Sequence, residues 1–219
     1  MNNKRPIITI DGPAASGKGS LSKVIAKDLN LYLMETGLYY RIFAYKFRRL
    51  SNESDVNKKL IVNNIDFHIT KADRKKLFAS DISKLASILA KKKSVRDLIV
   101  IKQKNMIINF PEIYNGIILE GRDCGTVIAP EAKIKFFLFS DLSTRANRRY
   151  LQLKKKNSVK FDRIYKELEE RDKRDKERKN SPLKVAKDAI KIDNTNLSLS
   201  ETINIVKKII FSTLPYLKK

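Results

Sequence analysis

The sequence predicts an α/β fold in which a mostly parallel sheet is covered by helices on both faces. Two observations lead to this prediction. Apolar runs rich in β-branched or aromatic residues occupy residues 7–11, 116–120 and 133–139, as in strands that are buried on both faces. The first and third runs lead on to residues with helical spacing, and the second runs into a loop. Strands that alternate with helices in this way form parallel sheets, because parallel neighbours need long crossover connections.

The first strand leads into a glycine-bearing loop. Gly12, four further residues and then Gly17-Lys18 match the core of the phosphate-binding loop (P-loop), in which backbone N–H groups and a helix N-terminus face an anion. An ordinary glycine-rich turn is the alternative, but the strand before and the helix after favour the P-loop. The motif usually has Ser or Thr after the lysine to hold Mg²⁺, whereas here Gly19 follows and the hydroxyl is displaced to Ser20. The residues expected to contact the nucleotide phosphates are Gly12, Pro13, Ala14, Ala15, Ser16, Gly17, Lys18, Gly19 and Ser20.

Composition restricts the partners of the protein. The 219 residues fit one domain and carry a formal charge of +23, which makes polyanions the first partners to consider. The same charge can arise without nucleic-acid binding in two ways. Lys, Ile and Asn are abundant along the whole chain, and an enzyme acting on phosphorylated substrates needs a positive cleft. We therefore do not expect nucleic acid to be the main partner.

The cysteine and histidine counts and the hydropathy of the chain exclude an internal disulfide, a His/Cys metal site and a membrane span. A single cysteine, Cys124, cannot form an internal disulfide and suits a reducing compartment. The single histidine, His68, lies in a run of alternating apolar and polar residues, so it is expected on the surface of a strand. One His and one Cys cannot make a His/Cys metal site. No apolar run is long enough to span a membrane, and residues 1–6 lack a signal-peptide core. We expect a cytoplasmic protein with no membrane partner.

The remaining elements follow in order. Early in the chain we expect a helix over residues 18–30, a short strand over 31–34 and a second helix with Thr36 as its N-cap. Residues 51–76 read as a peripheral insert with a short helix at 59–62, a strand at 65–70 and an exposed turn at 71–76. Helices are predicted over 81–90 and 95–109, a loop over 121–126, a helix opened by Ser140 or Asp141, a strand over 189–193 and a helix over 199–211.

Ligands of such sheets bind beyond the carboxyl ends of the strands. This rule places the P-loop, residues 35–41, residues 120–126 and the segment after Phe139 around one crevice.

A charged helix lies further along the chain. Arg171, Arg174, Asp175 and Arg178 have offsets of 0, 3, 4 and 7, which put them on one helix face. The alternative is a solvated helix with ion pairs at i,i+4, namely Glu167 with Arg171 and Asp172 with Lys176. Beside a P-loop, an arginine-bearing lid that neutralises phosphates is favoured. Arg145, Arg148 and Arg149 would extend this supply of cations.

Four motifs together give a specific resemblance. Residues 8–20, 36–41 (Thr-Gly-Leu-Tyr-Tyr-Arg), 121–126 (Gly-Arg-Asp-Cys-Gly-Thr) and 170–178 resemble the motifs of the bacterial cytidylate kinases, in the same order and with similar spacing. The resemblance implies a P-loop nucleoside monophosphate kinase fold with a five-stranded parallel sheet. It implies one domain over residues 1–219, a monophosphate-binding insert near 63–95 and a short lid near 154–180. The implied activity is ATP-dependent phosphorylation of CMP and dCMP, with Mg²⁺ entering with ATP, near Ser20 and without an assigned protein ligand.

The resemblance also implies residue roles. It assigns catalysis to Lys18, Arg41, Arg122, Arg174 and Arg178. It assigns substrate binding to Thr36, Arg41, Ser87, Arg96, Arg122, Asp123, Arg171, Asp175 and Arg178. Ser87, Arg96 and Asp123 would read the base, and a carboxylate with a guanidinium complements the N4 donor and the N3 and O2 acceptors of cytosine. An acceptor that is already an anion needs no general base, which agrees with the scarcity of histidine.

Three alternatives stay open at this stage. The first is a monophosphate kinase for UMP or AMP, and the second is a basic P-loop protein that binds nucleic acid and uses nucleotide as a switch. The third is a fold that has lost catalysis, which the presence of Lys18 and the lid arginines disfavours. A monomer is the default expectation.

Overall fold

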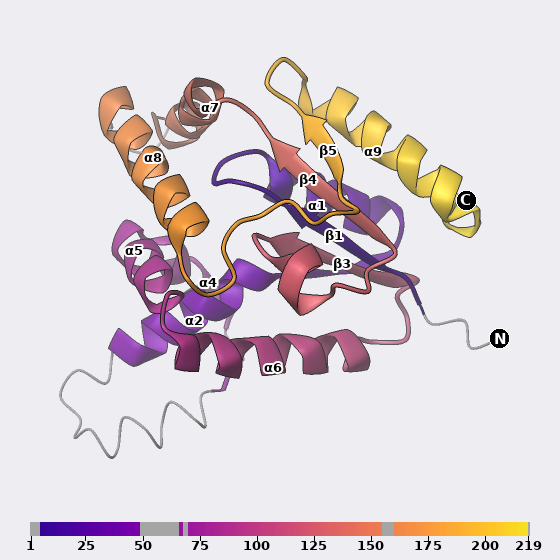
Figure 1. Ribbon diagram of the computed structural model, residues 1–219, viewed down its shortest axis with the longest axis horizontal. Coiled ribbons are helices and arrows are strands. Elements are labelled where there is room, and N and C mark those ends of the chain that lie inside the picture. Colours follow the sequence, from indigo (N-terminus) through magenta and orange to yellow (C-terminus); the bar gives the residue numbers. More distant parts are fainter. Residues whose placement is uncertain (1–4, 49–65, 68–69, 155–159, 219) are drawn as a thin grey trace. The chain divides into compact units, whose positions relative to one another are not determined.

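The computed structural model describes residues 5–48, 66–67, 70–154 and 160–218 (Figure 1). Within it the chain divides into two compact units, residues 1–34 with 106–219 and residues 35–105. The helix predicted around residues 59–62 and His68 lie outside the described residues. Among the helices that are described, none has both the length and the apolar character needed to cross a bilayer.

A five-stranded sheet forms the centre of the first unit. Its order is β2-β3-β1-β4-β5, with bounds Leu31–Glu35, Gly116–Gly121, Ile7–Asp11, Ile134–Phe139 and Ile190–Asp193. β1 pairs in parallel with β3 and with β4, and β4 pairs in parallel with β5. The parallel sheet expected from the sequence is therefore confirmed. Because β1 is central, the P-loop that follows it is flanked by the carboxyl ends of β3 and β4.

The helices of the first unit belong to two apolar clusters, one of which includes the strands of the sheet. α1 (Lys18–Asp28) and α9 (Leu199–Thr213) share one apolar core with the strands, which includes Ile8, Ile25, Phe136, Val206 and Ile210. α7 (Leu142–Lys154) and α8 (Phe161–Glu177) pack together in a second cluster with Ala14 of the P-loop. A capping box between Ser198 and Glu201 starts α9, and the Asp141 carboxylate caps α7 by accepting from Thr144 N at 2.6 Å.

The second unit is helical. It contains α2 (Thr36–Arg48), α4 (Lys71–Arg74), a 3₁₀ turn at Lys76–Phe78, α5 (Ser80–Leu89) and most of α6 (Lys93–Asn109). Its core gathers buried side chains of α2, α5 and α6, among them Phe43, Ile82 and Ile99. The exposed turn predicted at 71–76 is wrong in part. Residues 71–74 form a helical turn because the Thr70 hydroxyl accepts from Asp73 N at 3.2 Å and so caps it.

Candidate active site

The P-loop of this structure depends on backbone conformations that favour glycine. Gly12 has φ 149°, and a Cβ at this position would lie 1.9 Å from the carbonyl oxygen of Leu138 on β4. Gly17 has φ 92° and immediately precedes α1. Between them Ala15 has φ 59°, which an alanine adopts only when its surroundings hold it there. The glycines predicted as the frame of the loop therefore meet a steric requirement.

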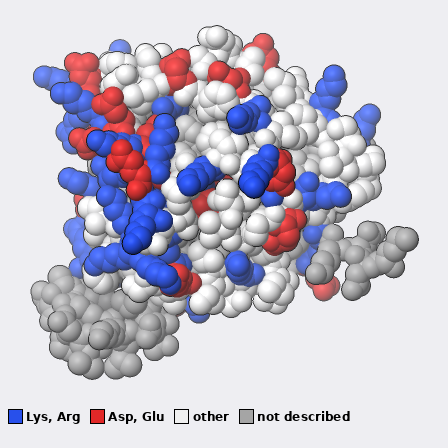
Figure 2. All heavy atoms as spheres, in the orientation of Figure 1, with Lys and Arg blue, Asp and Glu red and all other residues white. Residues whose placement is uncertain are grey.

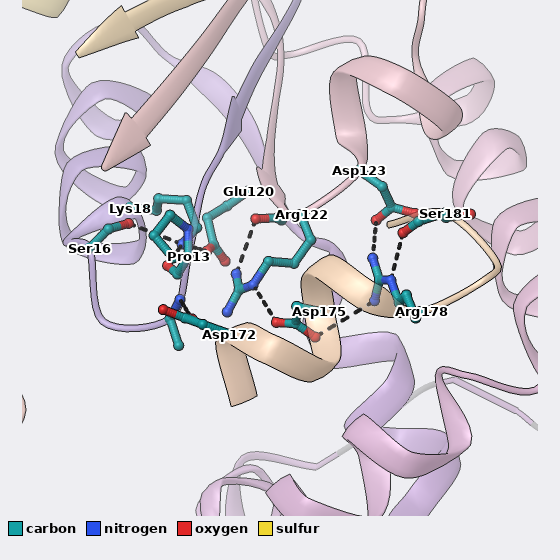
Figure 3. A network of polar contacts seen from close by, with 12 residues as sticks. Pro13, Ser16, Lys18, Glu120, Arg122, Asp123, Asp172, Asp175, Arg178 and Ser181 are labelled. Carbon is teal, nitrogen blue, oxygen red and sulfur yellow. Dashed lines mark hydrogen bonds and ion pairs between the residues drawn. The ribbon is translucent and has the colours of Figure 1, made fainter. Parts of the chain in front are cut away.

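Lys18 lies folded into this loop. Its side chain is 3% exposed, and Nζ donates to the Pro13 carbonyl at 2.6 Å and to Ser16 Oγ at 3.2 Å (Figure 3). The Glu120 carboxylate at the end of β3 is 3.9 Å from Nζ. Burial, with the positive charge of Arg122, lowers the pKa of Lys18 to about 7, although Glu120 opposes this shift. An incoming phosphate would add a negative charge here and so favour the charged ammonium.

The segment after β3 is held by a buried carboxylate of β1. Asp11 accepts hydrogen bonds from the N–H groups of Cys124 and Gly125, at 2.9 and 2.8 Å. Burial raises the pKa of Asp11 to about 6, because the loss of water outweighs these two hydrogen bonds. The loop predicted over residues 121–126 is therefore only partly irregular. Residues Cys124–Ile128 form a single π-helical turn whose first amides are bound by Asp11.

The charged side chains after β3 meet the C-terminal end of α8. Arg122 Nε donates to the Asp175 carboxylate at 3.0 Å, and Arg178 Nη1 is 3.9 Å from the other oxygen of Asp175. Arg178 Nη2 is 3.8 Å from the Asp123 carboxylate (Figure 3). Burial alone would raise the pKa of Asp175, but the charges of Arg122, Arg171 and Arg178 hold it below its ordinary value. Cations and carboxylates thus alternate in one buried network.

A buried carboxylate joins α8 to the P-loop, a contact that the sequence did not predict. Asp172 is 7% exposed, pairs with Arg145 of α7 and accepts from Ala14 N at 3.2 Å. The alternative of a solvated helix, in which Asp172 would pair with Lys176 at the surface, does not hold for Asp172. The signal in the sequence was the spacing, since Asp172 follows Ile164 and Leu168 of the buried face at intervals of four.

Other charged side chains of α7 and α8 also pair with groups of the protein. Glu167 pairs with Arg163 at 3.0 Å rather than with Arg171, and Arg174 pairs with Glu170 at 3.4 Å on the same helix. Arg148 donates to the carbonyl of Asn194 at 2.7 Å, so it ties α7 to the end of β5. Arg145 and Arg148 therefore link α7 to the P-loop and to the end of β5 in this structure.

The other predicted residues lie in the second unit. Arg41 of α2 donates to the Leu77 carbonyl at 2.9 Å and to the Ser83 hydroxyl. Thr36 is buried, and its carbonyl accepts from Gln103 at 3.0 Å. Arg96 is 3% exposed, lies over the ring of Tyr40 and donates to the Ala90 carbonyl at 3.1 Å. The Ser87 hydroxyl is shielded from solvent and has no hydrogen-bond partner among the described residues.

Fold and site together define a class. A P-loop after the central strand of a parallel sheet, a buried lysine and an arginine-bearing helix beside it are the parts of a P-loop kinase. Solved structures agree on the fold. An uncharacterized protein from Eubacterium ventriosum aligns with a TM-score of 0.54 at 15% identity, over 95% of this chain and 99% of its own. Shikimate kinase from Bacteroides thetaiotaomicron aligns with a TM-score of 0.50 at 11% identity, over 94% of this chain and 98% of its own.

Sequence comparison narrows the class to one family. The family model described as cytidylate kinase matches residues 8–212. The cytidylate kinase of Fusobacterium nucleatum is 40% identical over 217 residues, which cover 92% of this chain and 95% of the relative. The cytidylate kinase of Clostridium tetani is 37% identical, with 96% of each chain covered, and that of Pseudomonas putida is 36% identical, with 94% and 96% covered. The chain belongs to the cytidylate kinase family.

Proposed function

We propose that the protein transfers the terminal phosphoryl group of ATP to CMP and dCMP. The observation that carries this proposal is the buried network in which Lys18, Arg122 and Arg178 lie with the carboxylates of Glu120, Asp175 and Asp123. Fixed cations beside a P-loop are what two phosphate groups need in order to approach each other. Family membership supports the same reaction.

The donor nucleotide would bind at the P-loop. The amides of residues 12–20 would contact its phosphates, and Lys18 would exchange the Pro13 carbonyl for a phosphate oxygen. Such an exchange needs little movement of the backbone, because the lysine already lies inside the loop. Arg174, whose partner Glu170 lies one helical turn away and is 70% exposed, is the lid arginine that we assign to the transferring group.

The acceptor would be held by arginines and read by polar side chains. Arg41, Arg122 and Arg178 would bind its phosphate with Thr36, and Arg171 and Asp175 would bind its sugar. We assign base reading to Ser87, Arg96 and Asp123. The Ser87 hydroxyl supports this assignment, since a shielded hydroxyl without a partner among the described residues is ready for a polar ligand. UMP would set O4 against the Asp123 carboxylate, which costs about 1–3 kcal/mol, or about tenfold to a hundredfold in preference.

Mg²⁺ is implied by the family, and the oxygen donors present are consistent with it. Mg²⁺ prefers oxygen ligands and is bound mainly through substrate phosphates with one or two protein groups. Ser20 at the start of α1 and the Glu120 carboxylate are the side chains that we propose to lie near it. Among the described residues no three His, Cys, Asp or Glu side chains form a metal site. Bound with ATP, the ion would neutralise phosphate charge, while the protein supplies position and the remaining cations.

The two smaller parts of the domain have proposed roles as well. Residues 63–95 would form the monophosphate-binding insert, and residues 154–180, which include α8, would form the lid. We propose that the protein acts as a monomer in the cytoplasm, where its lone buried Cys124 would stay reduced. Light scattering of the purified protein tests the monomer.

A panel of acceptors tests the proposed function. Purified protein with Mg–ATP should convert CMP and dCMP faster than UMP or AMP, measured as ADP release and as nucleoside diphosphate formed. Fastest turnover on UMP or AMP would contradict the cytidylate assignment.

Nucleic-acid binding is less well supported by the surface. On the face shown in Figure 2, acidic side chains lie among the basic ones, also where the basic ones are densest. The exposed side of α8 carries both signs, with Arg163, Lys166, Lys173 and Lys176 beside Asp162, Glu167, Glu169, Glu170 and Glu177. A nucleic-acid site would favour a continuous basic stripe. Tight binding of RNA or DNA at physiological salt, without formation of CDP, would support this alternative instead.

A further inference from the structure

The lid helix α8 and its neighbour α7 together hold both backbone polar groups of one P-loop residue, Ala14. Asp172 of α8 accepts from the N–H of Ala14 at 3.2 Å, and Arg145 of α7 donates to the C=O of Ala14 at 3.1 Å. Arg145 also donates through Nε to the Ser140 carbonyl at 2.9 Å and pairs with Asp172. All of these side chains are at most 9% exposed. The pair is therefore shielded from competing water, which makes its hydrogen bonds to the loop effective constraints.

Fixing Ala14 fixes the peptide units on either side of it. In a trans peptide, the C=O of one residue and the N–H of the next lie in one plane and point in opposite directions. The Ala14 N–H faces Asp172, so the Pro13 C=O of the same plane faces the other way, where it accepts from Lys18 Nζ at 2.6 Å (Figure 3). Asp172 and Lys18 are thus joined through a single peptide unit.

The Ala14–Ala15 peptide unit is also oriented by a bond to one of its polar groups. Arg145 binds the Ala14 C=O, so the Ala15 N–H of that plane points away from Arg145. Ala15 is the residue whose φ of 59° disfavours any side chain, and the rigid hold on Ala14 helps to maintain it. The ion pair therefore orients an amide that belongs to the phosphate-binding part of the loop.

We propose that Asp172, acting with Arg145, is a positioning residue that sets the P-loop and Lys18 for ATP and links them to the lid helix. The link to the acceptor rests on the proposed function, since Arg171 and Asp175 of the same helix are assigned there to the sugar of CMP. Asp172 touches no nucleotide in this proposal. It acts through the Pro13–Ala14 and Ala14–Ala15 peptide units, so its loss should weaken the ATP side of the reaction first.

Asp172→Ala, with Asp172→Asn as the conservative variant, tests the proposal. In Asp172→Ala the KM for ATP should rise about tenfold or more, the usual effect of losing a charged hydrogen bond, while the KM for CMP changes less than about twofold. Asp172→Asn keeps an acceptor for Ala14 N–H and should recover part of the loss. Glu167→Ala is the matched control, because Glu167 lies on the same helix but is 54% exposed and pairs with Arg163 at the surface.

Two further measurements separate positioning from general damage. The amide resonance of Ala14, assigned in the protein without nucleotide, should shift upfield in Asp172→Ala and much less in Asp172→Asn. Because Asp172→Ala leaves Arg145 buried without its partner, the double variant Arg145→Met with Asp172→Leu provides a folded alternative and should show the same selective loss of ATP affinity. Unfolding midpoints confirm that each variant is folded.

The outcomes are distinct. Unchanged ATP affinity in a folded variant, or equal losses for ATP and CMP, would overturn the positioning role. ATP affinity from calorimetry tests that role even if the wild-type protein fails to phosphorylate CMP, a result that would overturn the proposed function alone.

Discussion

Replacing Asp11 by asparagine should remove a pH dependence of stability that this buried carboxyl creates. Asp11 is 4% exposed and binds two amides of the turn after β3. Burial raises its pKa from the ordinary value of 3.8 to about 6. Asparagine has nearly the same size and does not titrate, so the substitution removes the titration of this site. Its NH2 group cannot accept from the second of the two amides, which lowers the stability by an amount that does not depend on pH.

The sign follows from the protons bound in each state. Between pH 3.8 and about 6 the folded protein keeps the Asp11 proton, while the unfolded chain has lost it. The free energy of unfolding must then fall as the pH rises through this window, because the folded state binds more protons. The stabilising contribution is complete below the unfolded pKa and is lost as the pH passes the folded pKa. The full shift corresponds to about 3 kcal/mol, of which about 2 kcal/mol is lost between about pH 4.5 and pH 7.5.

Urea unfolding of both proteins at a series of pH values measures this effect. The difference in free energy of unfolding between wild type and Asp11→Asn should fall by about 2 kcal/mol across that range, since groups common to both proteins cancel. Asp97→Asn, which removes an exposed carboxylate of α6, is the control for the loss of one negative charge. Parallel curves for wild type and Asp11→Asn would refute the reasoning, because they would mean that Asp11 titrates alike in both states.

Three other substitutions test the site. Lys18→Ala should lower kcat by about a hundredfold or more by removing a fixed cation from the P-loop, and unchanged turnover with CMP would exclude that role. Asp123→Ala should reduce the preference for CMP over UMP by about tenfold to a hundredfold, and an unchanged ratio of kcat/KM would remove Asp123 from base reading. Gly12→Ala should destabilise the fold by about 3 kcal/mol or more, because its Cβ would meet the Leu138 carbonyl. Urea unfolding measures this last effect, and wild-type stability would contradict it.

The fold could be predicted from the sequence because its central parts carry local signals. The buried strands are short apolar runs, and the loop after β1 needs glycine where φ is 92° or where β4 passes too closely for a Cβ. The start of α7 was predictable for a similar reason, since the Asp141 carboxylate caps the helix by a contact three residues away. The start of α2 was not, because Thr36, predicted as its N-cap, is its first residue. Such signals survive without knowledge of tertiary contacts.

The roles of Asp11 and Asp172 could not be read in the same way. Asp11 binds amides of residues 124 and 125, and Asp172 binds the amide of residue 14, so both partners lie more than a hundred residues away. In the sequence, each carboxylate looks like an ordinary charged residue near a turn or on a helix. The spacing of Asp172 signals a buried helix face, but only the packed structure, with β3 beside β1 and α8 beside the P-loop, determines what the two carboxylates bind.

The pairing of charges at the site bears on how anions would enter it. Lys18, Arg122, Arg145 and Arg178 each lie within 4 Å of a carboxylate, and all four are largely buried. Without those carboxylates, burying the cations would cost several kcal/mol each. Phosphate groups that reach Arg122 or Arg178 would therefore exchange places with an internal carboxylate rather than meet a bare charge. One that reaches Lys18 would replace the Pro13 carbonyl. Arg145 differs, since its partner Asp172 also binds the P-loop backbone and would stay in place when nucleotide binds. Lys18, Arg122 and Arg178 would thus change their partners when nucleotide binds, whereas Arg145 would keep its partner. The site could then accept phosphate groups while the P-loop keeps its shape.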